Sequence, residues 1–321
     1  MKIEDLPLAR INFEDETFRI SDELEPAPLR SSLQSVGQIN PVMLLAGEDG
    51  RHAIVCGFRR LFLLRQLGAE HAAAFIQRGS DCSPLSLFHT AIWDNVAHRQ
   101  LSPLEKARIV RGLRTTFNVP QEVLVEKYLP VLTLPAHKNV LNGYLRLNEL
   151  HPDLKGLLNR ERISLSGAMR LAGYAWASQV LFASAVTKIR VSASLLRQVL
   201  ELVEEIAASC DCSHGEVLER PEIQAILADD RISPFQKGEA IHLVLYEKIH
   251  PRLCRARERY QEEKRRLNLP GSLRFIPDPF FETTRVKVEF EAFSPGDFRE
   301  MAAALNRAAQ SPSLDRIFDL E

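Results

Sequence analysis

Two arginines follow a glycine at the point where a predicted strand meets a predicted helix. Residues 53–56 form an apolar run typical of a buried strand, and residues 58–67 follow a helical period. Gly57 lets the chain turn sharply between them and leaves free amide donors at the helix start. Such a helix start attracts phosphate. Arg59 and Arg60 add positive charge and forked donors, and a bound anion would compensate for their unfavourable position on the helix macrodipole. The spacing predicts a phosphate site; pairing of both arginines with acids elsewhere is the alternative.

A carboxylate and an amide oxygen stand side by side at Asp94 and Asn95, at the end of a predicted helix. Both are hard oxygen ligands suited to a magnesium ion that bridges the phosphates of a nucleotide. An ordinary helix end is the alternative. Cys210 and Cys212 are the only closely spaced cysteines, and their spacing fits no common tetrahedral zinc site. We therefore expect the five cysteines to be reduced thiols.

The residues around the first two groups predict a small domain that mixes strands and helices. Apolar runs of four residues indicate buried strands, and longer segments with a helical period indicate helices. The expected elements are a helix at 29–36 ended by Gly37, strands at 42–45 and 53–56 joined by a turn at 47–50, and helices at 58–67 and 84–95.

The next segment is helical and positively charged. Ser102 and Glu105 predict a helix start with a capping box around Pro103. Residues 101–175 hold 11 Lys and Arg against 6 Asp and Glu, whereas the segments before and after hold 10 against 13 and 20 against 23. This modest local excess favours weak or partner-assisted contact with nucleic acid. After the first helix, which runs to about 117, helices are expected at 120–128, 136–147, 153–159 and 166–175, with an apolar turn at 129–135.

The last third is predicted to be helical to about residue 267, with a helix start at Ser233 and a break or kink at Pro251. The charged run 252–266 indicates a solvated helix. Apolar residues alternate with charged ones over 286–290, which predicts a half-buried strand, and Ser294 then starts a helix that runs to 309. We expect residues 270–321 to form a small α+β cap or dimerisation element.

Composition sets the broad class of the protein. The 321 residues suggest two to three domains, and 45% hydrophobic with 26% charged residues allows a buried core. The N-terminus is acidic and has no apolar run, and no stretch approaches the roughly 18 apolar residues of a membrane span. We therefore expect a soluble cytoplasmic protein without a membrane partner.

Three segments of the first domain resemble the nucleotide-binding motifs of the ParB family, in the family's order. Residues 37–42 are similar to its G-x-x-Q-P stretch, residues 55–60 to its G-E-R-R stretch, and residues 93–107 to E-N-x-Q-R-x-x-L-x-P-x-E-x-A. The resemblance covers residues 5–108 and continues less clearly to 175. It implies binding of CTP with magnesium. The implied metal ligands are Asp94 and Asn95, and the implied nucleotide-binding residues are Gly37, Gly57, Arg59, Arg60, Asn95 and Arg99; Arg99 could instead seal the domain junction.

The sequence departs from the family pattern at several of these positions. Asn40 stands where the family's Gln is tied to CTP hydrolysis, and Asp94 stands where the family has Glu. Phe58 replaces the Glu of G-E-R-R, and His98 replaces the Gln of E-N-x-Q-R. Shorter side chains move reactive groups by about an ångström, which can cost on the order of 100-fold in rate. We expect Asn40 and Asp94 in the catalytic positions, with nucleotide bound but hydrolysed slowly or not at all.

The middle region resembles the helix-turn-helix of the same family, because residues 120–124 match the start of its first helix and residues 140–147 match V-x-N-x-L-R-L. A recognition helix presents its N-terminal residues to the major groove, where Lys138 and Asn139 could read base edges. The candidate DNA-binding residues are His137, Lys138, Asn139, Asn142 and Arg146. A bundle that only buries its apolar helices is the alternative.

Other functions of related modules fit less well. A sulfiredoxin needs a nucleophilic cysteine after the glycine, but Phe58 stands there. A free-serine kinase needs a carboxylate base near Gly57, and the sequence shows none there. The sequence shows no carboxylate cluster suited to a two-metal nuclease. A further hypothesis is that the protein is an adaptor whose C-terminal half binds a protein partner.

We therefore expect an α+β ParB/sulfiredoxin-like domain (residues 1–100), an all-α helix-turn-helix domain (101–175), a helical region (176–269) and a small α+β end (270–321). The expected function is a CTP- and magnesium-dependent dimeric clamp on DNA, in chromosome or plasmid partition. A nucleotide-responsive transcription regulator or protein adaptor is the alternative. The expected partners are DNA, a second copy of the chain and a ParA-like ATPase, which places the protein on the cytoplasmic nucleoid.

Overall fold

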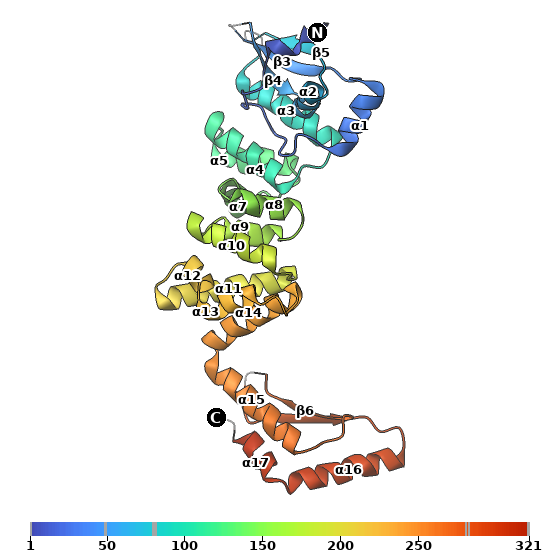
Figure 1. Ribbon diagram of the computed structural model, residues 1–321, viewed down its shortest axis with the longest axis vertical. Helices are drawn as coiled ribbons and strands as arrows, with labels where there is room; N and C mark the ends of the chain where they lie inside the picture. The colour runs from blue at the N-terminus through green and yellow to red at the C-terminus, as the bar shows by residue number, and fades with distance from the viewer. Residues whose placement is uncertain (1, 48–49, 79–81, 280, 282, 320–321) are drawn as a thin grey trace. The chain divides into compact units, whose positions relative to one another are not determined.

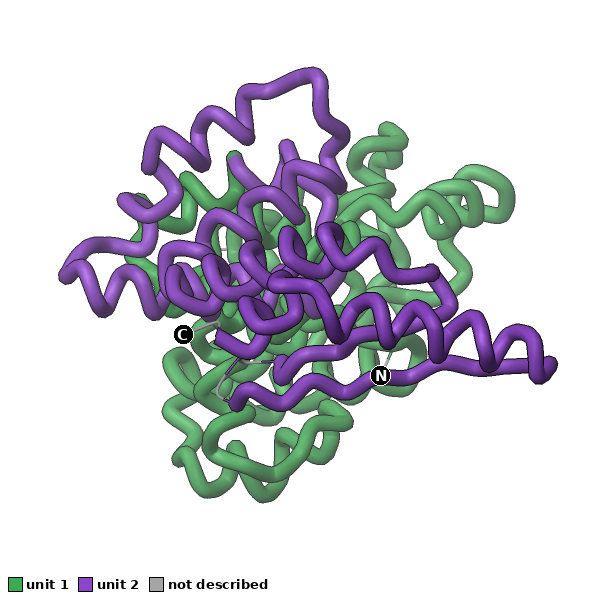
Figure 2. The backbone as a smooth tube through the Cα atoms, turned by 90° about the horizontal axis from the view of Figure 1, so that it is seen from below, with its two compact units in different colours: residues 1–184 green, residues 185–321 purple. Residues whose placement is uncertain are grey.

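The computed structural model describes residues 2–47, 50–78, 82–279, 281 and 283–319. These residues form two compact units, residues 1–184 and residues 185–321, which Figure 2 shows in different colours. Glu48 and Asp49 of the predicted turn lie outside the described residues. The predicted domain boundaries after residues 100, 175 and 269 stay predictions.

A curled five-stranded mixed sheet opens the first unit (Figure 1). Across the sheet, β1 pairs antiparallel with β5, β5 parallel with β3, β3 antiparallel with β4, and β4 parallel with β2. Both predicted strands are confirmed. The strands, in sheet order, are β1 (Ile3–Pro7), β5 (His71–Gln77), β3 (Val42–Ala46), β4 (His52–Cys56) and β2 (Ile11–Asn12).

The sheet buries both faces, each in a separate apolar cluster. On one face, Ile54 packs with the helices α1 (Ala27–Val36) and α2 (Phe58–Gln66). On the other face, its neighbour Val55 packs with α3 (Pro84–His98). Because successive side chains of a strand point to opposite faces, an apolar run such as 53–56 is required for burial on both sides.

The second cluster continues beyond the sheet into the helices that follow. Phe88 on α3 is 1% exposed, and its ring stacks on Phe117 with centroids 4.7 Å apart. The same cluster contains Ile109 of α4 (Pro103–Arg111) and Leu141 of α7 (Lys138–Leu147). The sheet, α3 and the helices after it therefore share one core.

Helices fill the rest of the first unit. α4 continues into a π-helical turn, η3 (Gly112–Thr116), and α5 (Gln121–Val123), η4 (Leu124–Tyr128) and α6 (Leu129–Val131) follow one another without a break. The predicted apolar turn at 129–135 was wrong in extent, because Leu129 is fully buried and the helix continues through Val131. The remaining helices are α8 (Pro152–Asn159), α9 (Leu165–Leu171) and α10 (Trp176–Lys188), of which α10 begins in the first unit and ends in the second.

The second unit begins as a helical array. Its helices are α11 (Ala193–Cys210), α12 (His214–Leu218), α13 (Pro221–Ala228), α14 (Pro234–Ile249) and α15 (Pro251–Arg266). The α14 start at Ser233 has the predicted capping box, and Pro251 starts a new helix. The helix predicted over the charged run 252–266 is found as α15, and most of its residues are exposed. It buries Tyr260 and Glu263, and the Tyr260 hydroxyl donates to the carbonyl of Phe275 at 2.7 Å.

The chain ends in a small α+β element. The predicted strand is confirmed as β7 (Val286–Phe290), and it pairs antiparallel with β6 (Leu273–Pro277). α16 (Pro295–Ala309) and α17 (Pro312–Phe318) complete the element around a core that contains Tyr260, Phe275 and Met301. The predicted fold class, an α+β N-terminal domain followed by helices and a small α+β end, is confirmed. No helix among the described residues is both long and apolar enough to cross a membrane.

Phe88→Ala should destabilise the first unit by about 3–5 kcal/mol, because it removes a ring on which the sheet and the helices both pack. Denaturant unfolding followed by tryptophan fluorescence measures this, since Trp93 and Trp176 both lie in the first unit. Val36→Ala, at a side chain that is 63% exposed, should change stability by less than about 0.5 kcal/mol. Equal losses in both variants would contradict the shared core.

Candidate functional site

A cavity of about 540 Å³ lies where the β4–α2 turn, the segment after α1 and the end of α3 meet. It gathers most of the residues that the sequence singled out for nucleotide and metal. Those that line it are Asn40, Gly57, Arg59, Arg60, Asp94, Asn95 and Arg99. Gly37 does not line the cavity: it ends α1 with φ 72° and ψ −162°, a conformation that glycine adopts readily.

Gly57 makes the turn from β4 into α2 in a left-handed conformation, with φ 101° and ψ 21°. A Cβ atom at this position would lie 2.5 Å from Cγ1 of Val42, so only glycine fits without movement of β3. No side chain among the described residues caps the start of α2. The first amides of α2 are therefore available to an anion in the cavity.

Arg60 fixes the loop that faces this helix start. Its Nη1 donates to the carbonyls of Asn40 and Pro41, at 2.7 and 2.9 Å. The Gln38 side chain pairs with the backbone of Ala73 through two hydrogen bonds of 2.8 and 2.9 Å, which ties the loop to β5. Gln38 was missed by the sequence interpretation, although it lies within the first motif.

Arg59 and Arg99 share one buried carboxylate, that of Glu105. Arg59 Nη2 lies 3.0 Å from Glu105 Oε1, and Arg99 Nη1 lies 2.6 Å from Glu105 Oε2. The Glu105 side chain is 2% exposed, whereas the two arginines keep 22% and 21% of their surface. Burial, followed by the charge of Arg99, lowers the pKa of Arg59, and the charges of Glu105 and Glu23 oppose this. Arg59 therefore pairs with an acid and also lines the cavity, so the two interpretations of this residue do not exclude each other.

Asn95 is already engaged as an acceptor. Its Oδ1 takes hydrogen bonds from Arg99 Nε at 3.1 Å and Arg99 Nη2 at 2.8 Å, and its Nδ2 donates to the carbonyl of Ala91. The Asp94 side chain is 38% exposed, with His98 Nδ1 at 3.8 Å. Asn95 could bind a cation only after Arg99 releases Oδ1.

The donor set around Asp94 is sparse for a metal by itself. Within the described parts of the chain, no three His, Cys, Asp or Glu side chains gather in a group that could hold a metal ion. Magnesium commonly uses one or two protein carboxylates, keeps several waters and takes the rest of its ligands from phosphates. Asp94 fits such a site when phosphate oxygens are present. Without phosphate, these residues provide too few ligands for a metal ion.

Cys56 precedes Gly57 at the end of β4 and is 6% exposed. Burial, and then the charge of Asp94, raises the pKa of its thiol to about 12. Because the thiolate is the nucleophile, this cysteine is unreactive at neutral pH. A sulfiredoxin-like reaction through Cys56 is thereby disfavoured on chemical grounds.

The candidate DNA-binding residues lie together on the solvent side of α7 and at its start. Lys138, Asn142 and Arg146 are spaced four residues apart, which places them on one helix face. The opposite face buries Leu141 and Leu147. His137, Lys138, Asn139, Asn142 and Arg146 are all exposed.

The chain is similar to curated proteins over about half of its length. No protein-family profile matches the chain. A probable chromosome-partitioning protein ParB from Vibrio cholerae is 25% identical over 177 residues, covering 55% of this chain and 56% of that protein. A nucleoid occlusion protein from Geobacillus is 27% identical over 163 residues, covering 50% and 54%. The chain thus matches about half the length of these curated relatives.

The sequence identity to two solved structures is lower than to these curated relatives. A C-terminally truncated ParB from Caulobacter crescentus, complexed with CTP-γ-S, is 20% identical, with a TM-score of 0.25 and coverage of 58% of this chain and 99% of that one. A Pnob8-like ParB-N domain is 13% identical, with a TM-score of 0.37 and coverage of 78% and 96%. Over the half of its length that its sequence relatives match, the chain is ParB/Noc-like, as its motifs predicted.

Proposed function

We propose that the first unit binds CTP in the cavity between the β4–α2 turn and α3, and that α7 binds DNA. The protein would act as a ParB-like DNA-binding protein in chromosome or plasmid partition or a related organisation of DNA. The observation that carries the proposal is that Gly57 and Arg60, at the start of α2, meet Asp94 of α3 at one cavity.

The phosphates are proposed to lie against the start of α2. Its uncapped amides and the Arg60 side chain offer donors of the kind that bind phosphate. Asp94 would bind magnesium together with phosphate oxygens, and Asn95 would join it once Arg99 moves. The ion would supply charge neutralisation between the phosphates.

Binding is proposed as the main role of the cavity, ahead of hydrolysis. Asn40 and Asp94 hold the positions proposed for catalysis, and both line the cavity. Each is one methylene shorter than the family residue, which favours slow hydrolysis or none. In this proposal the protein forms a homodimer that closes on DNA as a clamp through its N-terminal domains. A ParA-like ATPase would be a further partner.

DNA contact is proposed through the exposed face of α7. Lys138 and Arg146 supply charge for phosphates or base edges, and Asn139 and Asn142 supply amides that match adenine. Support comes from the exposure of all four side chains on a helix whose opposite face is anchored in the core.

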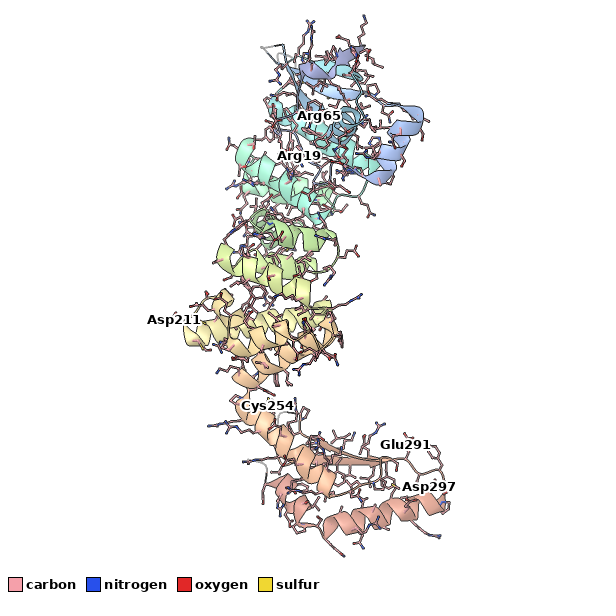
Figure 3. All side chains as sticks on the ribbon, viewed as in Figure 1. Arg19, Arg65, Asp211, Cys254, Glu291 and Asp297 are labelled. Atoms are coloured by element: carbon pink, nitrogen blue, oxygen red, sulfur yellow. The ribbon has the colours of Figure 1, made fainter. Side chains whose placement is uncertain are left out.

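Arg60→Ala should weaken CTP binding by about 10- to 100-fold, because it removes charge-assisted hydrogen bonds to phosphate. Calorimetry with CTP, ATP and GTP in the presence of magnesium measures this. Arg65→Ala is the matched control on the same helix, and Figure 3 labels Arg65. Arg65 stacks over Phe13 at 4.2 Å and does not line the cavity. Absence of binding to any nucleotide by the unaltered protein would reject the proposal.

Lys138→Ala should reduce the slope of log affinity against log salt by about one on duplex DNA, since it removes one phosphate-neutralising charge. Fluorescence anisotropy across a salt series gives the slope. Lys2→Ala removes an equal charge from an exposed residue just before β1 and should leave the slope unchanged. An unchanged slope in Lys138→Ala would show that α7 does not contact DNA through this residue.

A further inference from the structure

In the part of the chain that the structure describes, three helices start with the same capping box. The pairs are Ser102 with Glu105, Ser213 with Glu216, and Ser233 with Gln236. The amide oxygen of Gln236 accepts from the Ser233 backbone N–H at 2.9 Å, and the Gln236 backbone N–H donates to the Ser233 hydroxyl at 3.3 Å. Capping alone therefore does not require a negative charge at Glu105.

Glu105 also differs from the other two residues in its surroundings. Glu216 and Gln236 are exposed, whereas Glu105 is 2% exposed. A buried carboxylate is costly unless its charge is paired and its oxygens are hydrogen-bonded. The reason for the carboxylate must therefore lie in the groups around it.

Those groups fill every acceptor position of Glu105. Oε1 accepts from Arg59 at 3.0 Å and from the backbone N–H of Asp22 at 3.3 Å. Oε2 accepts from Arg99 at 2.6 Å and from the backbone N–H of Ser102 at 2.9 Å. Two guanidinium groups and two amides are thus satisfied by one carboxylate, and the three side chains together keep a net charge of +1.

The two arginines separate Glu105 from the proposed nucleotide cavity. Both Arg59 and Arg99 line that cavity, and both also line a second cavity of about 560 Å³ that includes Glu105. A carboxylate and a phosphate can each accept two parallel hydrogen bonds from a planar guanidinium group. An anion in the first cavity and Glu105 therefore compete for the same donors.

We propose that Glu105 is an internal counter-anion of the nucleotide site, which holds Arg59 and Arg99 until phosphate draws them away. The inference rests on the proposed nucleotide site and adds a residue that regulates it. When the arginines turn to phosphate, Glu105 loses its neutralising charges and moves toward water. The amides of Ser102 and Asp22 then lose their acceptor.

This exchange reaches the DNA-binding helix through the shared core. Ser102 caps α4, and α4 packs directly against α7. Ile109 on α4 and Leu141 on α7 belong to the same buried cluster. A loosened start of α4 thus changes the support on which α7 rests.

Glu105→Gln tests the charge while keeping the cap. The variant should bind CTP with magnesium more tightly than the unaltered protein, on the order of tenfold, because it removes one negative charge that competes with the phosphates for both arginines. A role limited to capping or to positioning the arginines predicts unchanged or weaker binding instead, and either result in calorimetry would overturn the proposal. Glu216→Gln makes the same substitution in another capping box and should leave CTP affinity unchanged.

Hydrogen exchange of the unaltered protein gives a second readout that does not depend on a variant folding. Saturating CTP with magnesium should speed exchange at the Ser102 and Asp22 amides, and the same addition to Glu105→Gln should change them much less. Slower or unchanged exchange in the unaltered protein would contradict the release of Glu105. If the unaltered protein binds no CTP, the proposed function and this inference fail together; if it binds without these effects, only the inference fails.

Discussion

The carboxylate of Glu105 satisfies donors from three separate parts of the first unit. It accepts from Arg59 at the start of α2, from Arg99 after α3, and from the backbone of the loop before α1. A charge buried to this extent is stable only when such partners stay in place, because its removal from water costs several kcal/mol. The position of the sheet, α3 and α4 relative to one another therefore depends on this carboxylate.

The apolar core supports the same arrangement from the inside. α3 carries Asn95 at the cavity and Phe88 in the cluster that extends to α4 and α7. One helix thus joins the cavity to the buried cluster that contains residues of α4 and α7. Because packed cores resist continuous deformation, a change at one end is passed on as a shift of whole elements.

Asn95 and Arg99 show that side chains lining the cavity already form hydrogen bonds with one another. Arg99 donates to Asn95, Ser21 and Glu105, so that most of its N–H groups already have acceptors. A site of this kind has to exchange internal bonds for ligand bonds, and its affinity is the difference between the two. The residues that line the cavity and the residues that hold the lining are therefore equally part of its chemistry.

Local sequence was sufficient for the parts of this protein that depend on neighbouring residues. The strand at 53–56, the turn at Gly57, the capping boxes and the exposed face of α7 all follow from periodicity and side-chain type within a few positions. The apolar stretch 129–135 was mistaken for a turn because apolar residues next to prolines are ambiguous, and burial of Leu129 decided that the helix continues. The pairing of β6 with β7 was also missed, since register between strands depends on residues far apart in the chain.

What only the tertiary structure decided is the choice of partners for each charge. From the sequence, Arg59 is expected as a phosphate ligand, Arg99 as a nucleotide-binding or junction residue, and Glu105 as a helix cap, with no sign that they touch. Arg59 and Glu105 lie 46 positions apart, and Asp22 and Glu105 lie 83 apart. Electrostatic pairing depends on distance and burial in space, and neither quantity is written in the local pattern of residues.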